Sequence, residues 1–215
     1  MPRSTSSPRL CQPDDSYGAK DPGSRHARLV TLPDSRSESG RKPRCSGLFE
    51  EAIAWLQEHY DEFEFWVERD LVWIVQSRLR QVIGERRLPY RVFNDYPLLP
   101  GARRARSADV VIRDAHETVL VAVEFKYEPS HRRAEMLPGK LPVVLWGVEG
   151  VAKDVMRIRE FVEQGAARTA FAVFVDEGRF FRHRLAHPGA AWRDWAPSRP
   201  GGHRVSVLWA RWPPT

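Results

Sequence analysis

Two acidic residues and a lysine stand beside apolar runs in the middle of the chain. Asp109 opens the run DVVI, and Glu124 and Lys126 close the run VLVAVEFK. Side chains alternate between the two faces of a β-strand, so Glu124 and Lys126 point to the same side, at the end of an otherwise apolar row. The predicted faces carry Val119, Val121, Val123 and Phe125 on one side, and Leu120, Ala122, Glu124 and Lys126 on the other. A carboxylate and an ammonium placed together in this way indicate a site that acts on a charged ligand.

The predicted strands 108–112 and 119–126 are close enough in sequence to form a hairpin around the polar segment RDAHET. If Arg113 lies opposite Leu120, Asp109 lies opposite Glu124, with Cβ atoms about 5 Å apart. The same register pairs Val110 with Val123, Val111 with Ala122 and Ile112 with Val121. Two carboxylates at that distance repel each other unless a cation neutralises them, and oxygen ligands suit Mg²⁺ or Mn²⁺. The sequence therefore predicts a divalent metal site with Lys126 beside it.

Apolar residues at helical spacing predict helices on both sides of these strands. The marker residues are Leu48, Ile53, Leu56 and Tyr60 in 48–60, Val72, Val75, Leu79 and Val82 in 65–87, and Val155, Ile158 and Val162 in 151–164. Glu68 lies four residues before Val72 and therefore at the start of an apolar stripe, where an unpaired charge is costly. Gln76 falls on another face of the same helix, which we expect to be solvated.

Further β-patterns lie at residues 90–95, 169–175 and 204–212, and 97–107 is predicted to be a loop. Together with the hairpin, these patterns give the order helix, three strands, helix, strand. We therefore expect an α/β fold with a mixed central sheet flanked by helices.

The acidic pair, the lysine and this order of elements resemble the PD-(D/E)xK nuclease superfamily. Asp109 followed by Glu124-Phe125-Lys126 at the end of the next strand is similar to its motif, although Ala108 replaces the proline. The resemblance covers about residues 62–176. It implies a restriction-endonuclease-like αβββαβ core and Mg²⁺-dependent hydrolysis of nucleic-acid phosphodiesters, in DNA more often than in RNA.

The resemblance also implies roles for individual residues. Asp109, Glu124 and the backbone carbonyl of Phe125 would bind metal, Lys126 would position or activate water, and Glu68 would be an additional ligand. Basic residues that could contact phosphates are Arg103, Arg104 and Arg106 in the loop and Lys153 at the start of the third helix, beside Asp154.

Several plainer interpretations remain open. Glu124 and Lys126 could form a surface ion pair with Asp109 as an acid near a turn, and Glu68 could be a solvated acid in a first helical turn. The loop arginines could be solvated, and the fold could serve as a catalytically silent module that binds nucleic acid or a protein. Four tryptophans could stack on bases, but we expect them to cover the edge of the core; they are Trp192, Trp195, Trp209 and Trp212.

The 215 residues suit one domain preceded by a flexible arm. Residues 1–46 contain nine Ser, six Pro and three Gly, a composition that predicts disorder, and the nuclease-like domain is expected over 47–215. The whole chain has a net charge of +6. The arm holds nine basic and five acidic residues, and the remainder of the chain holds 25 basic and 23 acidic residues. Attraction of a polyanion to the domain must therefore come from local clusters.

Cys11 and Cys45 both fall in the predicted arm, which excludes a disulfide scaffold or a cysteine-based zinc site in the predicted domain. No uncharged apolar run approaches the length that crosses a bilayer. We expect a cytoplasmic protein that does not enter a membrane, that binds nucleic acid, and for which a homodimer remains open.

Overall fold

The computed structural model describes residues 45–101, 105–130 and 144–213. The predicted arm lies outside the described residues except for its last two positions, and so do Arg103 and Arg104. The elements in chain order are α1 (Cys45–His59), the 3-10 helix η1 (Tyr60–Glu62), α2 (Glu68–Glu85), β1 (Arg91–Leu99), β2 (Arg106–Arg113), β3 (Val119–Glu128), α4 (Val151–Glu163), β4 (Thr169–Asp176), β5 (Ala190–Trp195) and β6 (Val205–Trp212). The predicted order of helix, three strands, helix and strand is confirmed by α2 to β4.

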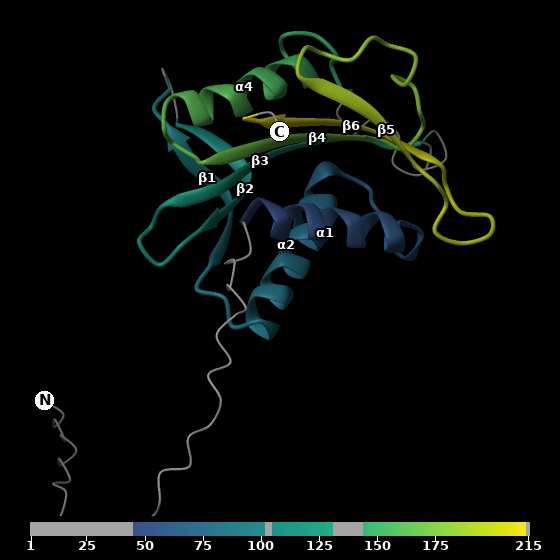
Figure 1. The fold of residues 1–215 in the computed structure, drawn as a ribbon. Helices are drawn as coiled ribbons and strands as arrows, with labels where there is room; N and C mark the ends of the chain where they lie inside the picture. The colour runs from purple at the N-terminus through teal and green to yellow at the C-terminus, as the bar shows by residue number, and fades with distance from the viewer. Residues whose placement is uncertain (1–44, 102–104, 131–143, 214–215) are drawn as a thin grey trace, which may run out of the picture. The chain divides into compact units, whose positions relative to one another are not determined.

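The six strands form one open sheet in the order β1-β2-β3-β4-β6-β5 (Figure 1). Only β3 and β4 run parallel, and α4 is the connection between them; every other neighbouring pair is antiparallel. The edge strand β5 was not predicted, because half of its side chains are exposed and its residues show no apolar alternation. The predicted mixed sheet flanked by helices is confirmed.

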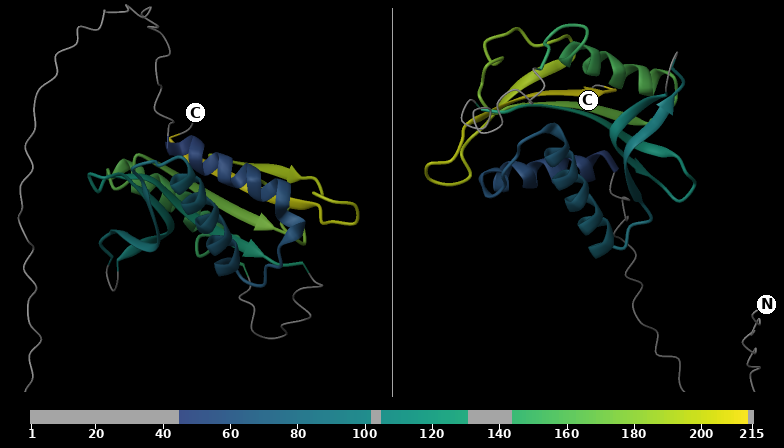
Figure 2. Two further views of the ribbon diagram at one scale, coloured as in Figure 1. Left: turned by 90° about the horizontal axis from the view of Figure 1, so that it is seen from below. Right: turned by 180° about the vertical axis from the view of Figure 1, so that it is seen from behind.

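Helices cover both faces of the sheet: α1 and α2 pack on one, and α4 packs on the other (Figures 1 and 2). The face towards α1 and α2 carries large side chains such as Phe125 and Phe171. The face towards α4 carries small ones, namely Ala122, Ala170, Ala172 and Ala210. Alanines let α4 approach the strands closely, which brings polar groups of that helix near the sheet. None of the helices in the described part of the chain is long and apolar enough to cross a membrane.

The predicted apolar stripe of α2 is confirmed, since its four valine and leucine positions are all buried. Gln76 is buried as well, so its predicted solvated position is wrong. On α4 the buried residues are Val151, Asp154, Ile158 and Phe161 rather than the full predicted stripe, of which only Ile158 is buried. The helix is therefore rotated so that Asp154, an acid, faces the sheet.

The predicted hairpin register is confirmed for Val110, Val111 and Ile112 with their partners on β3. It fails at the turn, where a register shift pairs Arg113 with Val119 instead of Leu120. As a result, Leu120 packs against the core under α1 and α2, and Val119 packs against the cluster under α4. The predicted faces of these two residues are therefore wrong, while Val121 to Lys126 keep the predicted alternation.

The ladder between β2 and β3 ends at the pair Val110 and Val123. Beyond that pair, β3 continues only with β4, as far as Glu128 and Asp176, while β2 continues with β1. The two strands thus part at Asp109 and Glu124, and these two acids are not a ladder pair as predicted. This parting opens the sheet at the predicted site.

The helix α1 begins at Cys45, two residues before the predicted start of the domain. Cys45 packs against the main core, so the prediction that the folded part contains no cysteine is wrong. Burial and the nearby charge of Asp114 raise the pKa of its thiol to about 12. At neutral pH it is therefore a protonated, apolar packing residue.

Candidate active site

Asp109 is fixed at the point where β2 leaves β3. The backbone N–H of Phe125 donates to its Oδ2 at 2.6 Å. Because the β2–β3 ladder has ended, the amide of Phe125 needs another acceptor, and the carboxylate of Asp109 provides it. The position of this carboxylate therefore depends on the point at which the two strands separate.

Glu124 lies beside Asp109 on the α4 side of the sheet and is only 3% exposed. Its Oε2 accepts a hydrogen bond from Nη1 of Arg157 on α4 at 3.0 Å. Its Oε1 is buried and accepts no hydrogen bond from any residue that the structure describes. Such an oxygen is costly in a core and stands out as a place for a ligand.

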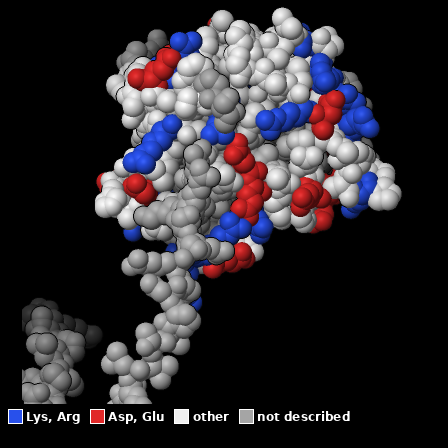
Figure 3. Space-filling model, viewed as in Figure 1, with Lys and Arg blue, Asp and Glu red and all other residues white. Residues whose placement is uncertain are grey.

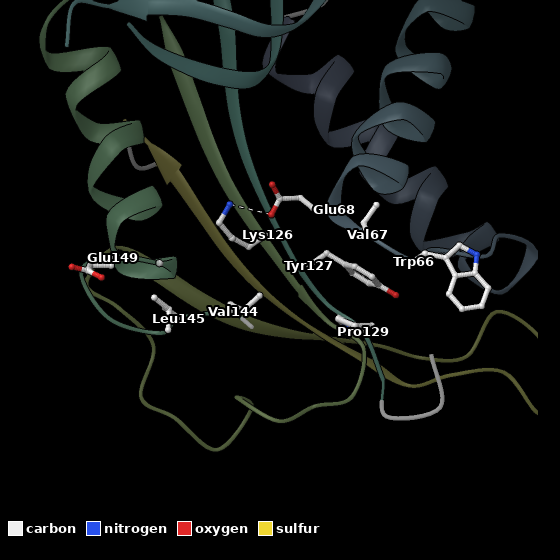
Figure 4. A pocket seen from close by; sticks show the side chains of 10 residues that line it. Trp66, Val67, Glu68, Lys126, Tyr127, Pro129, Val144, Leu145 and Glu149 are labelled. Atoms are coloured by element: carbon white, nitrogen blue, oxygen red, sulfur yellow. Dashed lines mark hydrogen bonds and ion pairs between the residues drawn. The ribbon is translucent and has the colours of Figure 1, made fainter. Parts of the chain in front are cut away.

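Lys126 connects three elements with its ammonium group. Its Nζ lies 3.0 Å from Oε2 of Glu68 on α2, 3.0 Å from the carbonyl oxygen of Phe125, and 3.4 Å from Oδ2 of Asp154 on α4. Figure 4 shows the bond to Glu68. The ammonium therefore lies where the two helices meet the end of β3.

The start of α2 is held so that Glu68 faces this lysine. The carboxylate of Asp70 accepts hydrogen bonds from the backbone N–H groups of Trp66 and Val67, at 2.8 and 3.0 Å. A side chain that satisfies free amides before the first turn fixes the direction in which a helix begins. Glu68 is the first residue of that turn.

The start of α4 depends on Gly150. A Cβ atom at this position would lie 1.7 Å from the carbonyl oxygen of Leu145, so no other residue fits without movement of the backbone. The tight turn also lets Val151 N donate to that carbonyl at 2.8 Å. It sets the helix so that Asp154, 3% exposed, points at the sheet.

The environment raises the pKa values of the acids. Burial, opposed by the bond from Phe125 and reinforced by the charges of Glu68 and Asp154, raises the pKa of Asp109 to about 7. Burial and the charges of Asp109 and Asp154 raise the pKa of Glu124 well above its usual value, although Arg157 opposes this. Burial also raises the pKa values of Glu68 and Asp154. The acids repel one another in a medium that screens poorly.

Lys126 responds in the opposite way. Burial lowers the pKa of its ammonium, but the negative charges of Asp154 and Glu68 outweigh burial and raise it above the usual value. Lys126 is therefore charged at every physiological pH. It supplies a fixed positive charge and hydrogen-bond donors, and it does not act as a base in this arrangement.

The structure brings the predicted residues Asp109, Glu124, Lys126 and Glu68 together. The alternative of a surface ion pair between Glu124 and Lys126 is wrong, because Glu124 is buried and pairs with Arg157. The alternative of a freely solvated Glu68 is also wrong, because its carboxylate pairs with Lys126.

The basic residues predicted to contact phosphates are placed less uniformly. Lys153 donates to the carbonyl oxygen of Glu149 at 3.4 Å, and its charge partly opposes the rise in the pKa values of the nearby Glu68 and Asp154. Nη1 of Arg106 forms an ion pair with Oε2 of Glu160 on α4 at 2.5 Å. Of the three arginines predicted in the loop, only Arg106 lies within the described residues.

Arg157 belongs to this cluster, and its role was not predicted. The sequence holds a signal for it: Val151, Asp154, Ile158 and Phe161 form a stripe at helical spacing that is interrupted by an acid. A charged residue inside such a stripe requires a partner, and Arg157 follows Asp154 by three positions, at 3.9 Å in the structure.

The charges of this cluster are not balanced. Of the four carboxyl groups, Glu68, Glu124 and Asp154 contact the two cations Lys126 and Arg157, and Asp109 contacts neither. If all four were ionised, the six groups would carry two net negative charges, which one divalent cation would balance. No three His, Cys, Asp or Glu side chains in the described ranges are placed so that they could hold a metal ion by themselves. Mg²⁺ commonly uses only one or two carboxylates, however, with waters and substrate phosphate as further ligands. Asp109 and the unpaired Oε1 of Glu124 fit that smaller donor set.

A pocket of about 280 Å³ opens beside the cluster (Figure 4). Glu68 and Lys126 line one part of it, and Trp66, Tyr127 and Leu145 are among its apolar walls. Glu68 and Lys126 are thus accessible from this side to a ligand with an apolar portion, whereas Asp109, Glu124 and Asp154 do not line this pocket.

The surface visible in Figure 3 shows basic and acidic side chains interspersed over short distances, without one extended patch of either sign.

No model of a known protein family matches this chain, and no curated protein has a matching sequence.

Proposed function

We propose that this protein is a divalent-metal-dependent nuclease of the PD-(D/E)xK type, with a restriction-endonuclease-like fold, that hydrolyses phosphodiester bonds in nucleic acid, with DNA favoured over RNA. One observation carries the proposal. Four acids converge where β2 and β3 part, with a fixed lysine beside them and with three buried carboxylate oxygens, Oε1 of Glu124 and both of Asp154, left without a hydrogen bond among the described residues.

Asp109 and Glu124 are assigned as the metal-binding acids. A bound Mg²⁺ or Mn²⁺ would neutralise their charge, polarise the phosphate and favour ionisation of a nearby water. Glu68, predicted as an additional ligand, is committed to Lys126 and is better assigned to positioning that lysine. The carbonyl of Phe125 accepts from the same ammonium.

In the reaction, water adds to phosphorus and a bond from phosphorus to a sugar oxygen breaks, with a proton passing to that oxygen. Negative charge grows on the phosphoryl oxygens during this step. Lys126, always charged and held from two sides, stabilises that charge and orients the water by donating hydrogen bonds. Arg157 keeps Glu124 in place, since it holds Oε2 and leaves Oε1 free.

The test is cleavage of end-labelled single-stranded DNA, duplex DNA and RNA in Mg²⁺, in Mn²⁺ and in EDTA. We expect cutting that requires metal and that is lost in Asp109→Asn and Lys126→Met. Arg159→Gln, which breaks the exposed pair with Glu163 on α4 outside the cluster, serves as a control for the loss of a positive charge.

Cutting that survives in EDTA or in both variants would contradict the proposal. Nucleic acid that is bound but never cut, with equal affinity for the wild type and Lys126→Met, would instead favour a catalytically silent binding module.

A further inference from the structure

A cluster of half-buried aromatic side chains lies next to the candidate active site, on the α4 side of the sheet. We call it the aromatic platform, and it consists of Trp146, Phe181, His187 and Trp192. The ring of Trp146 stands nearly parallel to those of Phe181 and Trp192, at interplanar angles of 12° and 5°, with ring centres 5.8 Å apart in both cases. The His187 ring stacks on Trp146 at 4.4 Å.

Arginines lie over these rings. The guanidinium of Arg184 is 5.4 Å from the ring centre of Phe181 and 6.0 Å from that of Trp146. Arg182 lies over Trp192 at 5.7 Å, but Asp194 pairs with it at 3.1 Å. Among the described residues, Arg184 has no carboxylate within ion-pair distance, so its charge is available to an external anion.

Exposed apolar side chains gather around the platform. The described residues include five large apolar side chains with high exposure, and three of them lie here: Leu145 at 51%, Val148 at 73% and Leu185 at 91%. Apolar side chains are rarely concentrated in this way on a surface that contacts only water. Combined with unpaired positive charge, the composition suits a ligand with both flat apolar faces and negative groups.

The platform is continuous with the candidate active site. A hollow of about 550 Å³ is lined by Trp146, Val148, Phe181 and Arg184. It shares Val144, Leu145 and Glu149 with the pocket that Glu68 and Lys126 line (Figure 4). A flexible chain with one phosphate at Lys126 would therefore cross Leu145 and reach the platform.

We propose that the platform binds unpaired bases, and that the substrate of this protein is single-stranded nucleic acid or the single-stranded end of a duplex. In a duplex the faces of the bases are covered by their neighbours, whereas in a single strand they are free to stack on aromatic side chains. Arg184 adds contact with the backbone phosphates or with a base face. The proposal rests on the proposed function for its choice of nucleic acid.

The test measures binding without cleavage. Fluorescence anisotropy of a labelled 12-mer of thymidine and of a 12-base-pair duplex is recorded with the full chain in EDTA, at fixed physiological salt. We expect the single strand to bind at least about tenfold more tightly than the duplex, because stacking of a few bases contributes that much or more.

Variants locate the binding. Arg184→Glu and Val148→Asp, both at exposed positions, are expected to weaken binding of the single strand about tenfold. The matched control is Arg78→Glu, which changes an arginine that lies 5.0 Å over Trp55, among the helices on the opposite face of the sheet. We expect it to change the affinity less than about twofold, and circular dichroism checks that each variant is folded.

Equal affinity for single strand and duplex would overturn the inference, as would equal effects of Arg184→Glu and Arg78→Glu. Absence of any nucleic-acid binding would also overturn the inference, and it would favour a protein as the partner of the platform. The two proposals fail separately. Tight single-strand binding without metal-dependent cleavage would contradict the proposed nuclease activity and support base binding at the platform. Metal-dependent cleavage with no preference for single strands would support the nuclease activity and contradict base binding at the platform.

Discussion

Asp61 and the acids of the candidate active site are buried in two parts of this molecule that treat carboxyl groups in opposite ways. Asp61, in η1, accepts hydrogen bonds from Ser198 N, Ser198 Oγ and His203 N, each at 2.8 Å. Burial alone would raise its pKa, but these donors outweigh burial and lower the pKa to about 2. Gly202 lies so close that a Cβ there would fall 2.1 Å from Oδ2. This carboxylate therefore links η1 to the connection between β5 and β6.

Asp109 and Glu124 are buried with far fewer donors. Among the described residues, Asp109 accepts one hydrogen bond, from Phe125 N, and Glu124 accepts one, from Arg157. Their pKa values are raised where that of Asp61 is lowered. A buried acid that is fully supplied with donors is part of the scaffold, whereas buried acids short of donors are held in a costly state that a ligand relieves. The comparison therefore distinguishes Asp61, an acid that holds the scaffold together, from the acids that we propose to bind metal.

The largest expected effect is on catalysis. Glu124→Gln keeps the size of the side chain and removes the charge, so we expect cleavage of labelled DNA in Mg²⁺ to fall by about 10³-fold or more. The control is Glu163→Gln on α4, whose carboxylate only pairs with Arg159 on the surface. Full activity of Glu124→Gln would remove this residue from the site.

The next effect is on stability, at the other buried acid. Asp61→Ala leaves the donors of Ser198 and His203 without their acceptor, and we expect the free energy of unfolding to fall by about 3 to 5 kcal/mol. Urea denaturation followed by tryptophan fluorescence measures it. Cleavage per folded molecule should not change, and a loss of activity as great as that of Glu124→Gln would break the distinction between the two regions.

The pH dependence of stability should have opposite signs in the two regions. Asp109 has a folded pKa of about 7, above the unfolded value near 3.9, so its contribution is greatest below about pH 4 and is lost as the pH rises towards 7. Asp61 has a folded pKa of about 2, so its contribution is present above about pH 4 and is lost as the pH falls towards 2.

Asp109→Asn tests the first half of this expectation. Asparagine still accepts the bond from Phe125 and carries no charge, so in EDTA at pH 8 we expect the variant to be more stable than the wild type by about 2 to 4 kcal/mol. The difference should shrink towards pH 4. Urea unfolding at several pH values gives it, and a variant that is less stable at pH 8 would show that this acid is not held in a costly state.

The smallest effect concerns the metal alone. At a Mg²⁺ concentration tenfold above its dissociation constant, binding to the folded state adds about 1.4 kcal/mol, or about 3 to 5 °C in melting temperature. We expect this gain for the wild type at pH 8, less of it at pH 5 where protons compete for Asp109, and none in Asp109→Asn. Asp61 is not expected to contribute to this stabilisation by metal. An equal increase in melting temperature in Asp109→Asn would show that the metal binds elsewhere.

Much of the fold could be predicted because burial imposes a local period on the sequence. The stripe of α2, the strands β2 to β4 and their order follow from spacing alone, and so does the shared face of Glu124 and Lys126. The edge strand β5 could not be predicted in this way, and the buried face of α4 was missed because its stripe includes the acid Asp154. Half of β5 is exposed, and which side of α4 is buried depends on the alanines of strands that are distant in sequence.

The sequence by itself determined which residue types stand at the end of β3, because alternation along a strand is a property of the backbone. Only the tertiary structure decided how their charges are paired: Lys126 with Glu68 and Asp154, and Glu124 with Arg157. It also decided that β2 leaves β3 at Asp109. The reason is that the pKa of an acid and the partners available to it depend on burial, and burial is produced by elements that come together only when the whole chain has folded.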